Sequence, residues 1–158
     1  MSTTVGGIRI RPMALTDLER VMGIAQSLKG APHWPHSAYL AALDHEAAPR
    51  RIALVAEAPE TGTVVGFAVT SLLPPQAELE TIAVAAEDQR RGIARRIFAA
   101  MVAELKTAAI SEVPLEVRAS NSSALAFYQT LGFIETGRRP RYYADPLEDA
   151  VLLELRLA

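Results

Sequence analysis

The residues of this chain best suited to chemistry form a short basic turn, Gln89-Arg90-Arg91-Gly92-Ile93-Ala94. The turn follows the apolar run 79–84 and precedes a long amphipathic stretch, so it is predicted to join a strand to a helix. The unpaired first-turn N–H groups and the positive end of the helix dipole both favour an anion there. Gly92 lets a ligand approach the main chain where a Cβ would intrude. The turn therefore predicts a pyrophosphate site.

The spacing of this turn differs from the common nucleotide motifs. A Walker loop needs a second glycine followed by Lys-Ser/Thr, and a Rossmann fingerprint needs two more glycines. The turn instead resembles the Q/R-x-x-G-x-G/A signature of the GNAT family of acyl-coenzyme A-dependent N-acetyltransferases, with Ala94 in the last position. The alternative is a helix cap with solvated arginines. The resemblance implies that acetyl-coenzyme A (acetyl-CoA) binds through Gln89, Arg90, Arg91, Gly92, Ile93, Ala94 and Arg95.

Three later segments sharpen the resemblance. Residues 115–121 read Leu-Glu-Val-Arg-Ala-Ser-Asn, and residues 124–133 contain Tyr128 followed by Leu-Gly-Phe at 131–133. Together they resemble the LEVRxSN…A…YxxLGF segment of the bacterial ribosomal-protein-alanine N-acetyltransferases, the RimI type of GNAT enzyme. Residues 138–150 resemble the RRxYY…EDA stretch of the same group. Several motifs in the right order are much harder to obtain by accident than one.

Two residues of these segments are candidates for proton transfer. Acetylation requires that the amine lose a proton, and the departing thiolate, from a group with a pKa of about 8.5, benefits from receiving one. The resemblance implies that Glu116 is the general base and Tyr128 the general acid. From the residues alone, Glu116 could be a solvated strand carboxylate that points away from Leu115 and Val117, and Tyr128 could belong to an apolar helix stripe.

The strand 79–84 carries no reactive group at its end, and the resemblance gives its main chain a role. Ile82, Ala83 and Val84 are expected to hydrogen-bond the pantetheine arm as an added strand would. The main chain at Val84 or its neighbours is the expected oxyanion donor. Asn121 is a natural N-cap for the next helix, and the resemblance implies that it also meets the pantetheine arm.

Four aromatic residues are candidates for the acceptor entrance, with packing or surface positions as the equal alternative: Trp34, Tyr39, Tyr142 and Tyr143. The tryptophan is flanked by His33 and Pro35, where RimI-type enzymes have Pro-Trp-Ser. Arg141 stands in place of a usual polar residue. These departures leave the identity of the acceptor open.

The elements that must position these residues follow from hydrophobic periodicity. Strands are predicted at residues 8–11, 51–57, 64–72, 79–84, 113–118, 133–138 and 150–157, and helices at 18–28, 37–45, from 93, and from 122 to 131. Thr16 and Glu19 predict a capping box at the first helix. The resemblance implies a single GNAT domain over residues 1–158. That α/β fold is one mixed, mostly antiparallel sheet of six to seven strands, with a parallel, splayed central pair and helices on both faces.

The composition of the chain bears on three kinds of partner, namely nucleic acids, metal ions and membranes. The chain has 158 residues, 50% hydrophobic and 22% charged, with a net charge of −2, so no basic footprint predicts nucleic-acid binding. The sequence has no cysteine, and the spacing of its three histidines fits no metal template, so we expect no metal site. The first five residues lack the charged and apolar regions of a signal peptide, and no apolar run approaches about 18 residues, so we expect a cytoplasmic location and no membrane partner.

The function expected from the resemblance is transfer of an acetyl group from acetyl-CoA directly to an amine. The first choice of acceptor is the N-terminal α-amine of a protein, such as the N-terminal alanine of a ribosomal protein. Two alternatives stay open, namely acetylation of a small-molecule amine and a non-catalytic CoA-binding regulatory module. The presence of both Glu116 and Tyr128 favours an enzyme, because a binding module needs neither.

Overall fold

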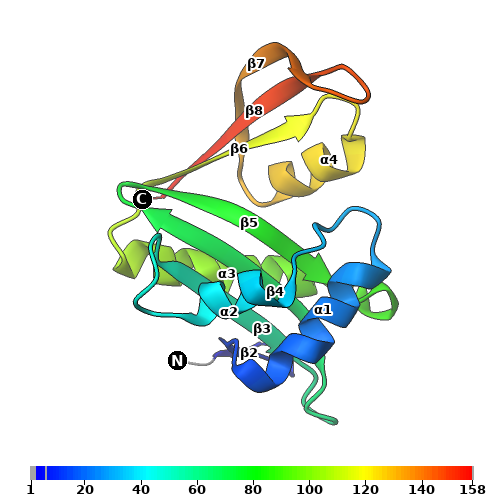
Figure 1. Ribbon diagram of the computed structural model, residues 1–158, viewed down its shortest axis with the longest axis vertical. Helices are drawn as coiled ribbons and strands as arrows, with labels where there is room; N and C mark the ends of the chain where they lie inside the picture. The colour runs from blue at the N-terminus through cyan, green and yellow to red at the C-terminus, as the bar shows by residue number, and fades with distance from the viewer. Residues whose placement is uncertain (1–2, 6, 158) are drawn as a thin grey trace.

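The protein is built on one mixed sheet, seen in a computed structural model that describes residues 3–5 and 7–157 (Figure 1). The strands are β1 (Thr3–Val5), β2 (Ile8–Pro12), β3 (Arg51–Glu57), β4 (Val64–Leu73), β5 (Gln76–Val84), β6 (Glu112–Arg118), β7 (Ile134–Tyr143) and β8 (Glu148–Arg156). Their order across the sheet is β1-β2-β3-β4-β5-β6-β8-β7. Seven of these strands are those predicted, and the eighth, β1, pairs with β2.

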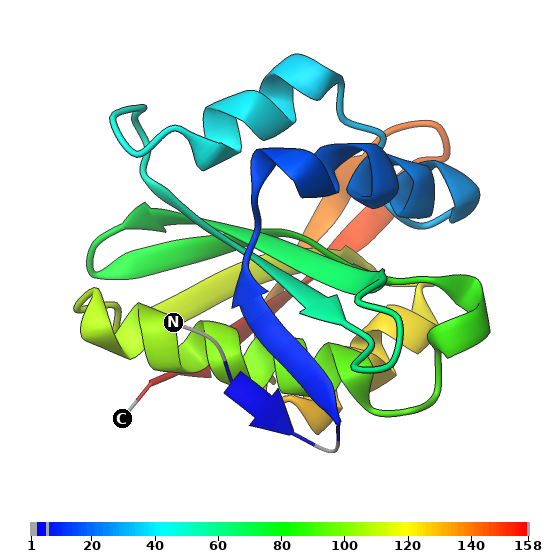
Figure 2. The same cartoon turned by 90° about the horizontal axis from the view of Figure 1, so that it is seen from below.

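Helices cover both faces of the sheet, as predicted (Figure 2). The helices α1 (Leu18–Ser27) and α2 (His36–Leu43) lie on one face, and α3 (Ile93–Thr107) lies on the other. The helix α4 (Ser122–Thr130) joins the same apolar cluster as α3. Two 3-10 turns, η1 (Leu15–Asp17) and η2 (Ala86–Asp88), precede α1 and α3. Within the described residues the GNAT architecture expected from the sequence is confirmed.

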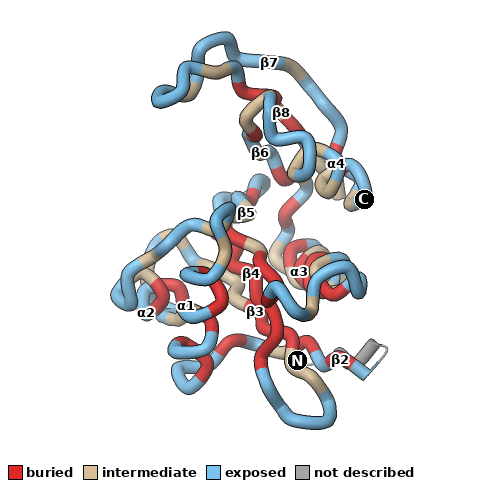
Figure 3. Tube along the Cα trace, turned by 90° about the vertical axis from the view of Figure 1, so that its right-hand side faces the viewer, coloured by how far each residue is buried: buried red, intermediate tan, exposed pale blue. Residues whose placement is uncertain are grey.

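The apolar core has two layers, one on each face of the sheet. The layer beneath α3 contains Ile93, Ile97 and Met101, which are at most 2% exposed and recur every four residues. The layer beneath α1 and α2 is centred on Phe67 of β4. Because helices cover both of its faces, β4 is buried along nearly its whole length (Figure 3). The most deeply buried strand of the sheet therefore lies directly beside β5.

The first helix begins at the predicted residue, but its N-terminal cap differs from the prediction. Thr16 is exposed in η1, and α1 begins at Leu18, so the capping box of Thr16 and Glu19 was wrong. Asp17 is buried instead, and its Oδ2 accepts a hydrogen bond from the Ala14 N–H at 2.7 Å. The guanidinium of Arg11 donates to both Asp17 oxygens, at 2.8 and 2.9 Å. A partner on the neighbouring strand thus determines where the helix begins.

Replacing Asp17 with asparagine is expected to lower the free energy of unfolding at pH 7 by about 2 kcal/mol, because hydrogen bonds to a charged group are lost. The bonds from Arg11 lower the pKa of Asp17 below its ordinary value of 3.8. A lowered folded-state pKa gives stability that is present above the unfolded value and is lost as pH falls through the folded one. Urea unfolding at stepped pH should therefore show the difference shrinking below about pH 4. A difference that does not change with pH would contradict this account.

The neighbouring strands β5 and β6 separate soon after they meet. They are parallel, and their register contains a single pair, Gln76 with Glu112. At that closed end the Pro75 carbonyl accepts the Ser111 N–H at 2.8 Å. Further along, the pairing of β5 with β4 shifts register between Val69 and Thr70, which leaves Glu80 as an extra residue of β5. Such a bulge increases the local twist of a strand. The predicted splayed central pair is confirmed.

Candidate active site

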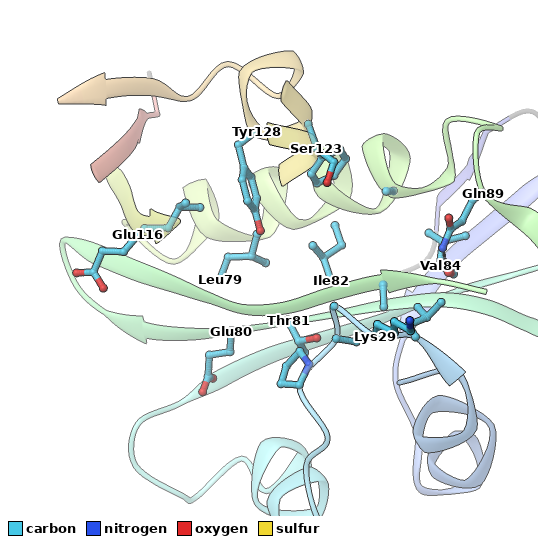
Figure 4. Close-up of a pocket in the computed structure, with 18 residues that line it drawn as sticks. Lys29, Leu79, Glu80, Thr81, Ile82, Val84, Gln89, Glu116, Ser123 and Tyr128 are labelled. Carbon is cyan, nitrogen blue, oxygen red and sulfur yellow. Dashed lines mark hydrogen bonds between the residues drawn. The ribbon is translucent and has the colours of Figure 1, made fainter. Parts of the chain in front are cut away.

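The separation of β5 and β6 opens a pocket of about 670 Å³, here called the central pocket. Its walls are the open edge of β5, the side of α4, the start of α3 and the segment 28–32 after α1. Figure 4 shows Glu116 at one end of the pocket and Gln89 with Val84 at the other. Beyond Gln76, the β6-facing edge of β5 has no strand partner among the described residues, so its main-chain groups can pair with an extended ligand.

The basic turn lies at one end of this pocket and lines a further pocket of about 440 Å³, the turn pocket. Gly92 is the N-cap of α3 and has a φ of +77°, a conformation that favours glycine. No side chain caps α3, and within residues 3–5 and 7–157 the N–H groups of Ile93, Ala94 and Arg95 have no acceptor. A Cβ added at Gly92 would meet nothing within 4 Å, so the space above the helix end is open. These features fit a pyrophosphate.

Glu116 stands on β6 where the central pocket meets a second cavity of about 660 Å³, the outer pocket. Its side chain is exposed, whereas its neighbours Leu115 and Val117 pack on the core, as the alternation of a strand predicts. The hydroxyl of Tyr142 donates a hydrogen bond to Glu116 Oε2 at 2.9 Å. This bond to a carboxylate raises the pKa of Tyr142. Glu116 is therefore a carboxylate reachable from two sides.

Tyr128 projects from α4 into the central pocket, toward β5 (Figure 4). Its ring packs edge-on against Phe133, with ring centroids 5.4 Å apart, and its side chain is half-buried. Burial raises the pKa of Tyr128, so the phenol remains protonated at neutral pH. The ring belongs to the core stripe and the residue also lines the pocket, so its packing role is confirmed and its role as general acid stays a prediction. A phenol placed this way can donate a proton inside the pocket.

The structure brings most of the predicted site residues together. The central pocket is lined by Ile82, Ala83, Val84, Gln89, Ala94, Glu116 and Tyr128. The turn pocket adds Arg90, Gly92, Ile93 and Arg95. Of the residues predicted to bind the cofactor, two lie apart from both linings in the described part of the chain. Arg91 forms an ion pair with Asp88 at 3.0 Å, and Asn121 caps α4 by accepting the Ala124 N–H at 3.2 Å. The cap is confirmed, and a contact of Asn121 with ligand remains a prediction.

Of the four aromatic candidates, Trp34 and Tyr142 lie near Glu116, Tyr143 lies under Arg118, and Tyr39 lies in the core. Trp34 lines the outer pocket together with Glu116, and Tyr142 contacts Glu116 directly. Tyr143 is half-buried beneath the guanidinium of Arg118, 4.5 Å from the ring centroid. Tyr39, by contrast, is 1% exposed and packs against Trp34 and Phe67, so the prediction that it frames the entrance was wrong. The sequence does not distinguish a tyrosine that is buried in the core from one that lies at the entrance of the site, because the residue suits both places.

Some residues of the site carried no recognisable sequence signal. Glu80 lines both the central and the outer pocket, and its Oε1 accepts a hydrogen bond from Arg51 Nε at 2.7 Å. The bulge that places Glu80 there depends on the pairing of two strands. Lys29 lies in the segment 28–32 that closes the pocket, and the Gly30–Pro35 break indicated only that a helix ends there. Ser123 and Phe127 of α4 border both the central and the turn pocket.

Comparison with known proteins identifies the family of this chain. Residues 18–133 match the Acetyltransferase (GNAT) family. The chain belongs to the GNAT acetyltransferase family. Over 101 residues it is 37% identical to the [ribosomal protein bS18]-alanine N-acetyltransferase of Escherichia coli (strain K12). The aligned region covers 63% of this chain and 68% of that protein. Over 155 residues it is 35% identical to the N-alpha-acetyltransferase RimI of Mycobacterium tuberculosis, covering 95% and 93%.

A solved structure from the group of ribosomal-protein-alanine N-acetyltransferases is also similar to this GNAT protein. The crystal structure of the ribosomal-protein-S18-alanine N-acetyltransferase from Escherichia coli has a TM-score of 0.78 at 29% identity, covering 96% of this chain and 94% of that one. The chain is thus an acetyl-CoA-dependent N-acetyltransferase by family. In the described residues, no cluster of three or more histidine, aspartate or glutamate side chains is arranged to hold a metal ion.

Proposed function

We propose that this GNAT enzyme transfers the acetyl group of acetyl-CoA to the N-terminal α-amine of a protein, with the N-terminal alanine of a ribosomal protein as the first choice. The observation that carries the proposal is the position of Glu116, a carboxylate on β6 that lines both the central pocket and the outer pocket. An α-amine has an ordinary pKa near 8, against about 10.4 for lysine, so a carboxylate base suffices more readily for the former. The relatives named above act on an N-terminal amine.

The central pocket and the turn pocket would hold acetyl-CoA. The amides of Ile93, Ala94 and Arg95 would bind its pyrophosphate, with Gln89, Arg90, Arg91 and Gly92 forming the turn around it. The open main-chain edge at Ile82, Ala83 and Val84 would pair with the pantetheine arm. Asn121, the N-cap of α4, would contact the same arm. The bound cosubstrate would supply the reactive thioester, whose end would lie in the β5–β6 gap near Glu116 and Tyr128.

The proton transfers follow from the two candidate catalytic residues. As the amine nitrogen bonds to the acetyl carbon, Glu116 accepts the proton that the nitrogen loses, directly or through one water. As the carbon–sulfur bond breaks, the phenol of Tyr128 donates its proton to the sulfur, which leaves as the thiol. The main chain near Val84 is the candidate donor to the developing oxyanion. Trp34, Tyr142 and Tyr143 would surround the acceptor peptide where it enters.

A protein acceptor of this kind places the enzyme in the cytoplasm, where ribosomal proteins are made. The described residues contain no helix with the length and hydropathy needed to cross a membrane.

Replacing Tyr128 with phenylalanine is expected to lower kcat by about 10- to 100-fold, since general-acid assistance typically contributes at least that much. The affinity for acetyl-CoA should change less than about twofold, because the ring and its packing on Phe133 are retained. Steady-state kinetics and calorimetric titration with acetyl-CoA measure the two quantities. An unchanged kcat would leave Tyr128 with a packing role alone.

The acceptor class is tested by offering three amines with acetyl-CoA and mapping the product by mass spectrometry. The first is a peptide with a free N-terminal alanine, the second the same peptide with a blocked N-terminus and one lysine, and the third a free polyamine. The proposal predicts one acetyl group on the α-nitrogen of the first peptide. Modification of only the lysine or the polyamine would refute the protein N-terminus as acceptor. Silence with all three, despite tight acetyl-CoA binding, would favour a non-catalytic binding module.

A further inference from the structure

Arg118, the last residue of β6, binds the turn between β7 and β8 at several points. Its Nη1 donates to the carbonyl of Pro146 at 3.0 Å and to Glu148 Oε1 at 3.2 Å, and its Nη2 donates to the carbonyl of Ala144 at 3.1 Å. The same guanidinium stacks on Tyr143, 4.5 Å from the ring centroid. One side chain therefore joins the end of β6 to residues 143–148. Only the planar, multiply donating guanidinium can make all of these contacts at once.

Glu148 strengthens this connection from the other side. Its Oε2 accepts the Ser120 N–H at 2.8 Å, just beyond the end of β6. The hydrogen bonds from Ser120 and Arg118 lower the pKa of Glu148, so its carboxylate stays ionised as the partner of the guanidinium. The chain leaving β6 and the chain entering β8 are thus held together by a two-residue charged link, Arg118–Glu148.

The link matters because the strand ladder alone does not hold the adjacent part of β7. The register of β7 against β8 shifts between Arg139 and Tyr143, and Arg141 within this stretch has a φ of +54°. Tyr142 lies in this irregular stretch, and its ring packs edge-on against Tyr143 at 5.1 Å between centroids. Its hydroxyl reaches across to Glu116 Oε2 at 2.9 Å. The Arg141 N–H bond to Asp149 Oδ1 at 3.0 Å and the guanidinium of Arg139 over the Tyr142 ring also act on this stretch. The position of Tyr142 over Glu116 depends in part on what anchors Tyr143.

We propose that Arg118 is a positioning residue for acetyl transfer. By clamping the β7–β8 turn through Tyr143 and Glu148, it holds the Tyr142 hydroxyl on Glu116 and so fixes the orientation in which that carboxylate meets the acceptor amine. The inference rests on the proposed function, in which Glu116 accepts the amine proton. The competing explanation is a partly exposed ion pair that contributes only to stability, since the Arg118 side chain is 34% exposed.

The two explanations differ in a double-mutant cycle. Arg118→Lys keeps the charge but cannot bridge two carbonyls, a carboxylate and a ring, so it should lower kcat for an N-terminal peptide by about tenfold. In a Tyr142→Phe background the same change should alter kcat by less than about twofold, because the group that Arg118 positions has already been removed. The Kd for acetyl-CoA should be unchanged in all variants, since the cosubstrate's pyrophosphate site lies at α3. The matched control is Arg138→Lys, which should leave kcat unchanged. Arg138 lies on β7, as Tyr142 does, and forms an exposed ion pair with Glu135.

A spectroscopic measurement tests the positioning without any acceptor. The hydrogen bond to Glu116 raises the pKa of Tyr142 above its ordinary value of 10.0, while Arg139 over the ring opposes this. Titration of ¹³C-labelled tyrosine, with the Tyr142 resonance assigned by its loss in Tyr142→Phe, should show a lower pKa in both Arg118→Lys and Glu116→Gln. The same titration in Arg138→Lys should match the unaltered protein.

Equal loss of kcat from Arg118→Lys in both backgrounds, or an unchanged Tyr142 titration, would overturn the role of Arg118. Those results would leave the proposed function intact if the unaltered enzyme still acetylates the peptide. Conversely, an unaltered enzyme that does not modify N-terminal amines would refute the proposed acceptor, while the tyrosine titration would still decide whether Arg118 positions Tyr142.

Discussion

Replacing Gly92 with glutamate is expected to weaken acetyl-CoA binding by at least about 100-fold, since juxtaposed like charges cost several kcal/mol and each 1.4 kcal/mol is tenfold in affinity. Gly92 is the N-cap of α3, and a side chain there would stand over the free amides of Ile93, Ala94 and Arg95. A carboxylate at that point would occupy the space proposed for the pyrophosphate and repel it. Calorimetric titration with acetyl-CoA gives the Kd.

The chain contains a matched control for this change. Gly62, in the turn between β3 and β4, has a φ of +69°, and a Cβ added there also meets nothing within 4 Å. Gly62→Glu therefore bears the same backbone strain, about 1 kcal/mol, without touching the site. Both variants should lose similar thermal stability, and only Gly92→Glu should lose affinity. Equal Kd values for the two variants would show that the pyrophosphate binds elsewhere.

Replacing Glu116 with glutamine is expected to lower kcat by about 100- to 1,000-fold near pH 7, the range typical of a general base. The side chain keeps its size and can still accept the Tyr142 hydrogen bond, so acetyl-CoA binding should be unchanged. The loss should be largest below the amine pKa of about 8, where the acceptor is mostly protonated, and should narrow above about pH 9. A pH profile of kcat with an N-terminal peptide checks both the size and the trend.

Glu112 provides the comparison for Glu116. It lies on the same face of β6, four residues earlier, at the closed end of the β5–β6 pair, where its Oε1 accepts a hydrogen bond from Gln76 at 2.8 Å. Glu112→Gln should leave kcat within about twofold of the unaltered enzyme, as surface substitutions away from a site usually do. A loss in Glu116→Gln that is small, or that does not change with pH, would count against a role as base.

Features governed by local spacing could be predicted from the sequence. The four-residue repeat of Ile93, Ile97 and Met101 correctly predicted the buried face of α3, and the glycine before it correctly marked the helix start. Asn121 was correctly predicted as the N-cap of α4 because capping is decided within a few residues. The capping box of Thr16 and Glu19 was mispredicted for the opposite reason, since the bond from Arg11 to Asp17 comes from a strand.

In the candidate site, too, local motifs could be predicted from the sequence and long-range contacts could not. Glu116 and Tyr128 were identified through their family motif, whereas the hydrogen bond between Tyr142 and Glu116 joins residues 26 positions apart. That contact requires β6, β8 and β7 to lie side by side and the β7 register to shift, and no periodicity carries this information. The bulge at Glu80 likewise arises only when β4 and β5 pair. Long-range pairing, rather than local propensity, decides these positions.

The most direct test of this account is a crystal structure of the protein with acetyl-CoA. We expect the pyrophosphate on the N–H groups of Ile93, Ala94 and Arg95, the pantetheine arm along the open edge of β5, and the thioester in the gap near Glu116 and Tyr128. A nucleotide bound away from the start of α3, with the β5–β6 gap empty, would contradict it.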